Sequence, residues 1–247
     1  MITLSIVIPA FDEEQKIGPD VRAAAAFLAS GGIRGEVIVA DDGSSDRTAE
    51  RAEALAHGLA VPLSVIRCGD HRGKGAAVRS GILSSAGEFV LFADSGVTVP
   101  FDSALSGLQL LREGHAEIAN GSRELPGSVI RRERDWDRRL ISRLFRTLVL
   151  RWMHIPRALT DTQCGFKLYR GDVARTLYAE CTTEGFMFDI EIILRAMAHG
   201  WRIVEFPVEW TCDRDSRLGI RRSARPVIRD LLRIRRTLVT RPPSGRT

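Results

Sequence analysis

Short apolar runs alternate with helix-forming segments through the first half of the chain, and this alternation limits the fold more than any other feature. The apolar runs, each bounded by turn residues, cover residues 4–9, 35–40, 63–66 and 89–92. The helix-forming segments between them cover residues 13–30, 45–57 and 75–85. Strands that alternate with helices predict an α/β fold with a mostly parallel sheet and helices on both faces.

Acidic residues follow three of the four predicted strands. Glu13 comes after the first strand, Asp41 and Asp42 follow the second, and Asp94 follows the fourth. Ligands of an open parallel sheet bind outside the carboxyl ends of the strands, so we expect these carboxylates to share one crevice. Carboxylates repel phosphate unless a divalent cation lies between them or they contact base and ribose instead. The pattern therefore favours a nucleotide diphosphate accompanied by Mg²⁺ or Mn²⁺.

Two common nucleotide-binding signatures are missing from these turns. No Gly-x-Gly-x-x-Gly follows the first strand, and residues 73–75 (Gly-Lys-Gly) lack the spacing of a P-loop. Hydride-transfer and phosphoryl-transfer enzymes of those types are thereby disfavoured. Residues 73–75 still lie between a strand and a helix, where Lys74 could neutralise diphosphate charge. The same tripeptide could also be only a turn.

Charge divides the chain into two unlike halves. Residues 1–122 carry a net charge of −6 and residues 123–247 one of +11, which together give +5. Of the 36 basic residues 33 are arginine, the side chain that binds phosphate through a planar fork. The basic half favours a phosphate-rich partner, either nucleic acid or an anionic membrane face. Biased codon usage would also enrich arginine.

Two basic segments of that half have helical periodicity. The first segment covers residues 139–149, and the second is the last predicted helix. In both, apolar residues occupy one helix face and arginines another. The apolar face of the last helix carries Val227, Leu231, Ile234 and Leu238. Such helices either cover the sheet or bind a membrane surface. No apolar run approaches the roughly 18 residues of a membrane span, and the four cysteines are widely spaced. We expect a cytoplasmic protein with reduced thiols, peripherally attached to the cytosolic face of a membrane, and a disordered tail at 240–247.

Six ordered blocks together carry a family resemblance. They lie at residues 8–14 (Ile-Pro-Ala-Phe-Asp-Glu-Glu), 41–44 (Asp-Asp-Gly-Ser), 72–75 (Arg-Gly-Lys-Gly), 92–94 (Phe-Ala-Asp), 121–123 (Gly-Ser-Arg) and 161–167 (Asp-Thr-Gln-Cys-Gly-Phe-Lys). In order and spacing the chain resembles family 2 glycosyltransferases, above all the branch of dolichyl-phosphate β-glucosyltransferases and polyprenyl-phosphate hexose synthases. The resemblance implies one GT-A domain over residues 1–239, with a nucleotide-sugar half (1–122) and an acceptor half with C-terminal helices (123–239).

The resemblance also implies roles for individual residues. The nucleotide-sugar side would comprise Pro9, Ala10, Glu13, Asp41, Asp42, Lys74 and Asp94, the last also as metal ligand. The acceptor side would comprise Arg123, Arg139, Ser142, Gly165 and Asp189. The catalytic group would comprise Asp94, Arg123, Arg139, Asp161 and Gln163. For Asp189, helix capping or pairing with a nearby arginine is an equal alternative.

One position departs from the family pattern. The family places a second acid two residues after Asp94, but this chain has Gly96, which has no side chain to bind a cation. We therefore expect a weakened Mg²⁺ or Mn²⁺ site, with water and diphosphate oxygens as the other ligands. The expected reaction moves a hexose, glucose or N-acetylhexosamine, from a UDP-sugar to a polyprenyl phosphate (dolichyl, undecaprenyl or decaprenyl) with inversion. An ionised phosphate needs no general base.

Several alternatives stay open. A mannose synthase that uses GDP-mannose has the same framework, and Gly96 is also compatible with a catalytically silent GT-A-like module. A nucleotidyltransferase would lack its glycine-rich start and would leave residues 161–167 unexplained. Nucleic-acid binding explains the arginines but not the acids at the strand ends, so we expect no nucleic-acid partner. Lipid contact would occur through the basic helices or through a small integral membrane partner.

Overall fold

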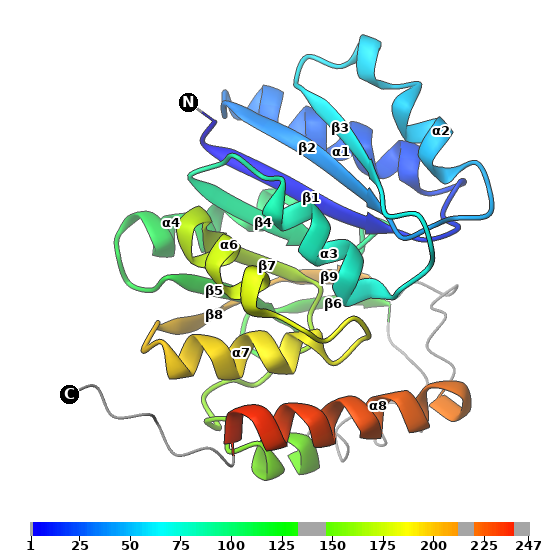
Figure 1. Cartoon of the computed structure of the whole chain (residues 1–247). Coiled ribbons are helices and arrows are strands. Elements are labelled where there is room, and N and C mark those ends of the chain that lie inside the picture. The colour runs from blue at the N-terminus through cyan, green and yellow to red at the C-terminus, as the bar shows by residue number, and fades with distance from the viewer. Residues whose placement is uncertain (1, 133–146, 212–219, 240–247) are drawn as a thin grey trace.

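The computed structural model describes residues 2–132, 147–211 and 220–239. Within these residues a seven-stranded sheet has the order β3-β2-β1-β4-β7-β5-β8, and β6 and β9 form a separate pair (Figure 1). The strands are β1 (Leu4–Ala10), β2 (Gly35–Asp41), β3 (Leu63–Arg67), β4 (Phe89–Ala93), β5 (Ile118–Ser122), β6 (Val129–Arg132), β7 (Phe166–Arg170), β8 (Ile203–Pro207) and β9 (Glu209–Thr211). In the large sheet β7 is antiparallel to both of its neighbours, β4 and β5.

The centre of the sheet explains the apolar runs of the sequence. β1 lies between β2 and β4 and is parallel to both. It sends Leu4, Ile6 and Ile8 into the apolar cluster on one face of the sheet and Val7 into the cluster on the other face. A strand covered on both faces needs apolar residues at successive positions, because neither face meets water.

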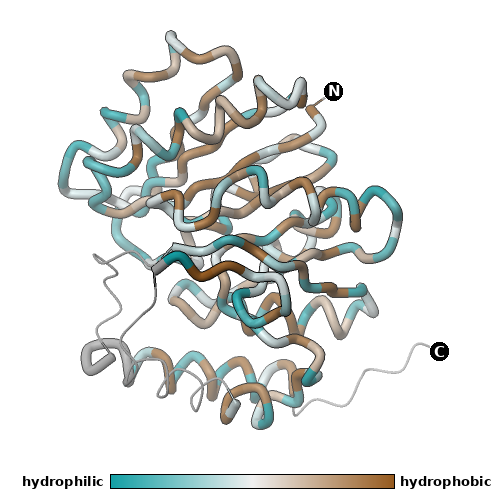
Figure 2. The backbone as a smooth tube through the Cα atoms, turned by 180° about the vertical axis from the view of Figure 1, so that it is seen from behind, coloured by the Kyte–Doolittle hydropathy of each residue, from teal (hydrophilic) through white to brown (hydrophobic). Residues whose placement is uncertain are grey.

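Helices cover the sheet on both faces (Figure 1). One apolar cluster joins the strands to α1 (Ile17–Ser30), α2 (Thr48–Glu53) and α4 (Ala104–Arg112). The opposite cluster joins them to α3 (Lys74–Leu83), α6 (Gly171–Glu180) and α7 (Phe188–Ala198). Figure 2 shows hydrophobic segments along the strands and hydrophilic ones at outer turns. The predicted α/β architecture with two covered faces is confirmed.

A third apolar cluster joins segments that are far apart in the sequence. It packs a helix at 147–152 and α7 against α8 (Ile220–Ile234) and the π-helical segment η3 (Arg235–Val239). Leu231 and Ile234 of α8 are buried there beside Met153 and Leu194. Figure 1 shows α8 running below α7, with the 147–152 helix next to it. In the described ranges every helix is too short or too polar to cross a membrane.

Boundaries differ from the sequence expectation in two places. The first helix begins at Ile17, because the backbone at 13–16 forms a turn in which the Glu13 carbonyl accepts the N–H groups of Lys16 and Ile17. The segment 45–57 contains α2 and then a short 3₁₀ helix, η1 (Ala56–Gly58), in place of one continuous helix. Asp46 accepts the N–H of Thr48, the first residue of α2, at 3.0 Å.

Three expectations are not tested by this structure. The basic helix expected at 139–149 lies outside the described residues up to position 146, and the tail at 240–247 lies outside them entirely. The division into a nucleotide-sugar half at 1–122 and an acceptor half at 123–239 stays a prediction. Strands from both proposed halves belong to the one large sheet, since β5 precedes the boundary while β7 and β8 follow it.

Candidate active site

The carboxyl ends of β1, β2 and β4 meet at the topological switch point of the sheet. The chain passes from β1 to β2 on one side, whereas β4 pairs with β1 on the other, and ligands bind at such reversals. Pairing between β1 and β4 ends at Val7, so β1 separates from β4 beyond this residue. The buried Pro9 and Ala10 end β1, and Asp94 directly follows β4. The predicted crevice is thus bordered by the predicted residues.

Hydrogen bonds tie the loop after β1 to the loop after β2. Ser44 Oγ accepts the Asp12 N–H at 2.8 Å, and Thr48 Oγ1 accepts the Glu13 N–H at 2.7 Å. In return Asp12 Oδ1 accepts the Ser45 N–H at 2.7 Å. Asp12 has a φ of 47°, a left-handed conformation that aspartate tolerates better than most residues. These contacts fix the backbone that presents the acidic side chains.

Glu13 and Asp41, two of the acids expected on the nucleotide-sugar side, lie in different surroundings. Asp41 is buried and accepts hydrogen bonds from the hydroxyl and the N–H group of Ser44. Glu13 keeps about a fifth of its side chain exposed (20%) and forms an ion pair with Lys16 at 3.4 Å. A ligand can therefore reach the Glu13 carboxylate, while the buried Asp41 holds the loop after β2 through Ser44. Their contact with a nucleoside stays a prediction.

Asp42 is held within the protein. Its carboxylate is buried and accepts the N–H groups of Arg72 at 3.1 Å and Gly73 at 2.8 Å. His71 Nδ1 lies 2.8 Å from the same carboxylate and stacks its ring on Phe11 at 3.9 Å between centroids. Asp42 therefore positions the loop before α3, and its place near the nucleotide stays a prediction.

Lys74 and Asp94 form the central ion pair of the crevice. Lys74 Nζ lies 2.7 Å from Asp94 Oδ1 and 5.3 Å from the centre of the Phe92 ring. Burial lowers the pKa of Lys74, but the charges of Asp94 and Asp189 outweigh this effect, so the pKa lies above its ordinary value. Lys74 is therefore a cation at any working pH, in the acid-lined part of the site.

Gly165 allows Asp94 to occupy its place. A Cβ atom on Gly165 would lie 2.0 Å from Asp94 Oδ2, which no side chain can accommodate. The Asp94 N–H also donates to the Gly165 carbonyl at 2.8 Å. The motif at 161–167 thus supports the carboxylate that follows β4 through its glycine. Direct contact of Gly165 with an acceptor stays a prediction.

Asp20 is a site residue that sequence reasoning missed. It lies on α1, is buried, and accepts the Ser95 hydroxyl at 2.7 Å and the Gly96 N–H at 2.9 Å. Burial raises the pKa of Asp20, and these hydrogen bonds together with Val97 act against that rise. An aspartate in the first turn of an otherwise apolar helix was the available signal. Asp20 fixes the turn in which the family's second acid is replaced by glycine.

Lys167 and Asp189 form a second buried ion pair beneath the site. The Lys167 ammonium contacts the Asp189 carboxylate and donates to the Thr162 carbonyl at 3.0 Å. Burial raises the pKa of Asp189, while the charges of Lys167 and Lys74 lower it in part. The alternative expected for Asp189, pairing with a cation, is thus observed with a lysine and not an arginine. A contact of Asp189 with an acceptor stays a prediction.

Arg123 is joined to Asp161 by a two-pronged ion pair. Arg123 Nε and Nη2 lie 2.6 and 2.8 Å from the two Asp161 oxygens, and the Arg123 N–H donates to the same carboxylate. The guanidinium lies 5.2 Å from the centre of the Trp210 ring. Glu205 of β8 accepts the Asp161 N–H at 2.7 Å. Burial lowers the pKa of Arg123, but Asp161 and, more weakly, Asp94 raise it above its ordinary value.

The remaining predicted residues are placed only in part. Gln163 is half-buried, and its amide contacts Met187 Sδ at 4.0 Å, a weak interaction. Arg139 and Ser142, both expected on the acceptor side, lie outside the described residues. The structure therefore brings Lys74, Asp94, Arg123, Asp161 and Asp189 near one another, since their charges affect one another's pKa.

The side chains at this crevice do not form a resident divalent-cation site. Asp94 already pairs with Lys74, Gly96 has no ligand to offer, and Asp20 is occupied by the turn it supports. In the described part of the chain, no three His, Cys, Asp or Glu side chains gather closely enough to hold a metal. Mg²⁺ is usually held by one or two carboxylates together with substrate phosphates and water, so a cation at this place would take most of its ligands from the donor diphosphate.

The fold and the crevice define a nucleotide-sugar enzyme with a GT-A architecture. A model of the family described as "Glycosyl transferase family 2" matches residues 5–177. The chain belongs to this family and is an inverting glycosyltransferase. The matched region contains every strand end that borders the crevice and the motif at 161–167.

Relatives with assigned activities match most of the chain. Dolichyl-phosphate β-glucosyltransferase of Drosophila melanogaster is 35% identical over 224 residues, which are 85% of this chain and 67% of the relative. The human protein of that name is 33% identical over 249 residues, 96% of this chain and 76% of its own length. Glycosyltransferase AglD of Haloferax volcanii is 29% identical and aligns with 98% of this chain, but with only 38% of its own length.

Solved structures support the fold. Glucosyl-3-phosphoglycerate synthase of Mycobacterium tuberculosis, in complex with Mn²⁺ and UDP-glucose, superposes with a TM-score of 0.70 at 20% identity. The match covers 94% of this chain and 79% of that one. A second structure of the same enzyme gives a TM-score of 0.69 over 94% of this chain and 80% of that one, again at 20% identity. The GT-A fold expected from the sequence is confirmed.

Proposed function

We propose that the chain transfers a hexose from a UDP-sugar to a polyprenyl phosphate, with glucose as the first candidate sugar. The relatives that align over 85–96% of the chain are named for glucosyl transfer to dolichyl phosphate. The structural observation that carries the proposal is the proximity of two ion pairs, Lys74 with Asp94 and Arg123 with Asp161. A cation and an anion from each proposed half lie close enough for their charges to interact, which supports a site that takes two anionic substrates.

The proposed reaction is an in-line displacement at the anomeric carbon. An oxygen of the acceptor phosphate forms the new bond to this carbon, and the bond to the UDP oxygen breaks with its electron pair leaving on UDP. The acceptor oxygen is already ionised at neutral pH, so no side chain has to remove a proton. The protein's contribution is then to align two anions and to stabilise the departing charge.

On the donor side, the proposal assigns base and ribose contacts to Glu13 and the buried end of β1. Glu13 has a partly exposed carboxylate next to the switch point, and Pro9 and Ala10 form the adjacent backbone. Asp41 and Asp42 would act by holding the loops that line the nucleotide, as their hydrogen bonds indicate. Short buried contacts of this kind give a preformed site.

On the acceptor side, the proposal assigns phosphate binding to Arg139 and to the remaining donor of Arg123. Two nitrogens of Arg123 are engaged by Asp161, which leaves Nη1 to approach an anion. Arginine is suited to this task because its fork is rigid and permanently charged. Asp161 would position Arg123, and Gln163 and Ser142 would complete this side.

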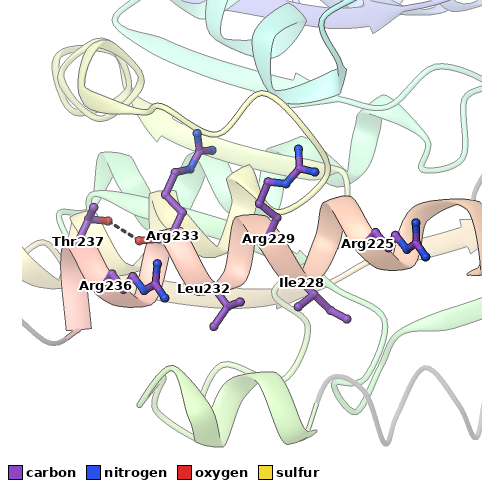
Figure 3. Close-up of a pocket in the computed structure, with 7 residues that line it drawn as sticks. All are labelled: Arg225, Ile228, Arg229, Leu232, Arg233, Arg236 and Thr237. Carbon is purple, nitrogen blue, oxygen red and sulfur yellow. Dashed lines mark hydrogen bonds between the residues drawn. The ribbon is translucent and has the colours of Figure 1, made fainter.

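The outer face of α8 supports contact with an anionic lipid surface. Ile228 and Leu232 are 56% and 40% exposed, and Leu148 on the neighbouring helix is 68% exposed. A groove of about 490 Å³ lies along α8, with Ile228 and Leu232 pointing away from the sheet (Figure 3). The groove is also lined by arginines at positions 225, 229, 233 and 236. Apolar side chains flanked by arginines fit the boundary between acyl chains and anionic headgroups.

This surface would bring the site to a lipid-bound acceptor from the cytoplasmic side. Only one occupant is proposed for it, an anionic membrane, because arginines and exposed apolar side chains of α8 line the same groove. Binding to a small integral membrane protein instead is an outcome of the lipid experiment described in the Discussion.

Product analysis tests the proposed function. The purified chain is incubated with undecaprenyl or dolichyl phosphate and, separately, UDP-glucose, UDP-N-acetylglucosamine and GDP-mannose, and lipid products are identified by mass spectrometry. We expect a polyprenyl-phosphate hexose from a UDP-sugar. Product only from GDP-mannose would establish the mannose synthase, and nucleotide-sugar binding without product from any donor would establish a silent module, the alternative raised by Gly96.

A further inference from the structure

Lys74 occupies the place in this crevice where a cation is needed. It is the first residue of α3, and its N-cap, Gly73, has a φ of 125°, which only glycine adopts without strain. A Cβ on Gly73 would lie 2.6 Å from the Glu184 carbonyl, so the loop is closely packed and the start of α3 is fixed. The N-terminal amides of a helix favour an anion, and the ammonium group adds a full positive charge beside them.

The surroundings of Lys74 limit where its charge can act. In the described residues its ammonium contacts one acceptor side chain, Asp94, and lies over the ring of Phe92. An ammonium group has three N–H donors, so an ion pair with one carboxylate oxygen leaves two for a ligand. About a quarter of the Lys74 side chain (24%) and a third of that of Asp94 (31%) are exposed, so a ligand can reach both.

The turn after β4 offers no side-chain ligand for a metal at position 96, where the family has its second acid. Gly96 has a φ of 95°, and its N–H points to the buried carboxylate of Asp20. Both carboxylate oxygens of Asp20 accept hydrogen bonds, from the Ser95 hydroxyl and the Gly96 N–H. Position 96 therefore lacks an acid for two reasons. Glycine has no carboxylate, and the backbone conformation there is one that residues with a side chain rarely adopt.

We infer that Lys74 replaces the divalent cation as the main counter-charge of the donor diphosphate, so that nucleotide binding does not require a metal. The inference rests on the proposed function, in which the donor is a UDP-sugar. Before donor binding, Asp94 holds the ammonium of Lys74 at the crevice. In the transfer step the bond between the anomeric carbon and the UDP oxygen breaks, and the charge developing on that oxygen is stabilised by Lys74, which stays protonated throughout.

The experiment measures binding by titration calorimetry, with UDP and inorganic pyrophosphate as probes. Each probe is titrated into metal-stripped protein in EDTA and into protein with excess Mn²⁺. The variants are Lys74→Met, Lys74→Arg and the control Arg170→Met. Arg170 is an exposed arginine paired with Asp172, at the end of β7 opposite to the crevice. Circular dichroism and thermal melting verify that each variant is folded.

We expect the parent to bind UDP in EDTA within about threefold of its affinity in Mn²⁺. Lys74→Met should weaken both probes in EDTA by about tenfold or more, Lys74→Arg should retain most binding, and Arg170→Met should match the parent. Loss of UDP binding by the parent in EDTA, or unchanged binding by folded Lys74→Met, would overturn the inference. Lys74-dependent binding of pyrophosphate without any binding of UDP would support the inference and contradict the UDP-sugar assignment.

Discussion

The two sides of the crevice are constructed by different physical means. At the ends of β1 and β2, carboxylates and hydroxyls accept backbone N–H groups of nearby loops, as for Asp12, Asp41 and Asp42. Around β5, β7 and α7, charged side chains are instead paired with opposite charges, Arg123 with Asp161 and Lys167 with Asp189. The donor side thus depends on loop geometry, and the acceptor side depends on compensated buried charge.

This difference predicts how much a substitution on each side costs in free energy of unfolding. A loop that loses one hydrogen bond loses about 1 kcal/mol and shifts slightly. A buried ion pair that loses one partner leaves an uncompensated charge, which costs several kcal/mol. Substitutions that break a buried ion pair should therefore act mainly on folding, and substitutions in the loops of the site should act mainly on activity.

The largest effect is expected for the buried pair under the site. Lys167→Met should lower the free energy of unfolding by about 3–5 kcal/mol, because it leaves the carboxylate of Asp189 buried without its cation. Denaturant unfolding measures the change. The double variant Lys167→Met/Asp189→Leu should recover most of the loss, and the partly exposed Lys16→Met serves as control. A single variant as stable as the parent would remove the contrast between the two sides.

A loop substitution should instead abolish activity with a smaller cost in stability. Gly165→Ala places a Cβ 2.0 Å from Asp94 Oδ2 and must displace that carboxylate. Because displacements of about 1 Å at a reacting centre cost roughly 100-fold, kcat/KM should fall by at least about that factor. Gly58→Ala is the matched control, since nothing lies within 4 Å of its Cβ. Activity within threefold of the parent would show that Asp94 is not required where it lies.

The pH dependence of the free energy of unfolding tests how much the ionised carboxylate of Glu191 stabilises the fold. Burial raises the pKa of Glu191, but hydrogen bonds from Thr183 and Thr182 and the ion pair with Arg195 bring the pKa below its ordinary value of 4.5. A lowered pKa means that the ionised form stabilises the fold above pH 4.5, and that this stability is lost as the pH falls through the folded-state pKa.

Glu191→Gln should therefore lower the free energy of unfolding at pH 7 by about 1–3 kcal/mol, and the difference from the parent should shrink below about pH 4.5. Unfolding curves between pH 3 and 7 measure it, with the exposed Glu88→Gln as control. A difference that grew as the pH fell would contradict the assigned direction.

The smallest effect is expected on the outer face of α8. Ile228→Asp should reduce binding to vesicles that contain anionic lipid by about tenfold and leave vesicle-free activity on a short-chain acceptor unchanged. Vesicle flotation measures it, and Leu105→Asp, an equally exposed apolar side chain on α4, is the control. No binding of the parent to such vesicles would reject the lipid surface and favour an integral membrane protein as the partner.

The same contrast explains what the sequence could predict. The donor-side residues lie in short motifs directly after strands, so the alternation of strands and helices was sufficient to place Glu13, Asp41 and Asp94 at one edge. The contacts that complete the site are long-range: Asp20 is 75 residues from Ser95, and Arg123 is 38 residues from Asp161. Nothing in local periodicity indicates such pairs.

Long-range packing also gives two of the predicted site residues contacts that the sequence did not indicate. Asp42 was expected near the nucleotide, and its carboxylate proves to hold the loop before α3. Lys74 was expected as a neighbour of diphosphate, but its pairing with Asp94 depends on the approach of α3 to β4. The motif at 72–75 therefore identified Lys74 as a charged residue of interest, and only the fold showed that Asp94 is its partner.

The most direct test of the account compares the two sides in one kinetic measurement. Product formation is followed against UDP-sugar and against polyprenyl phosphate for the parent, Glu13→Gln and Arg139→Ala. The account predicts that Glu13→Gln raises the KM for the donor by about tenfold at an unchanged acceptor KM. It predicts that Arg139→Ala weakens use of the lipid phosphate much more than binding of the donor. Equal use of lipid phosphate by Arg139→Ala and the parent would contradict the division of the crevice into a donor side and an acceptor side.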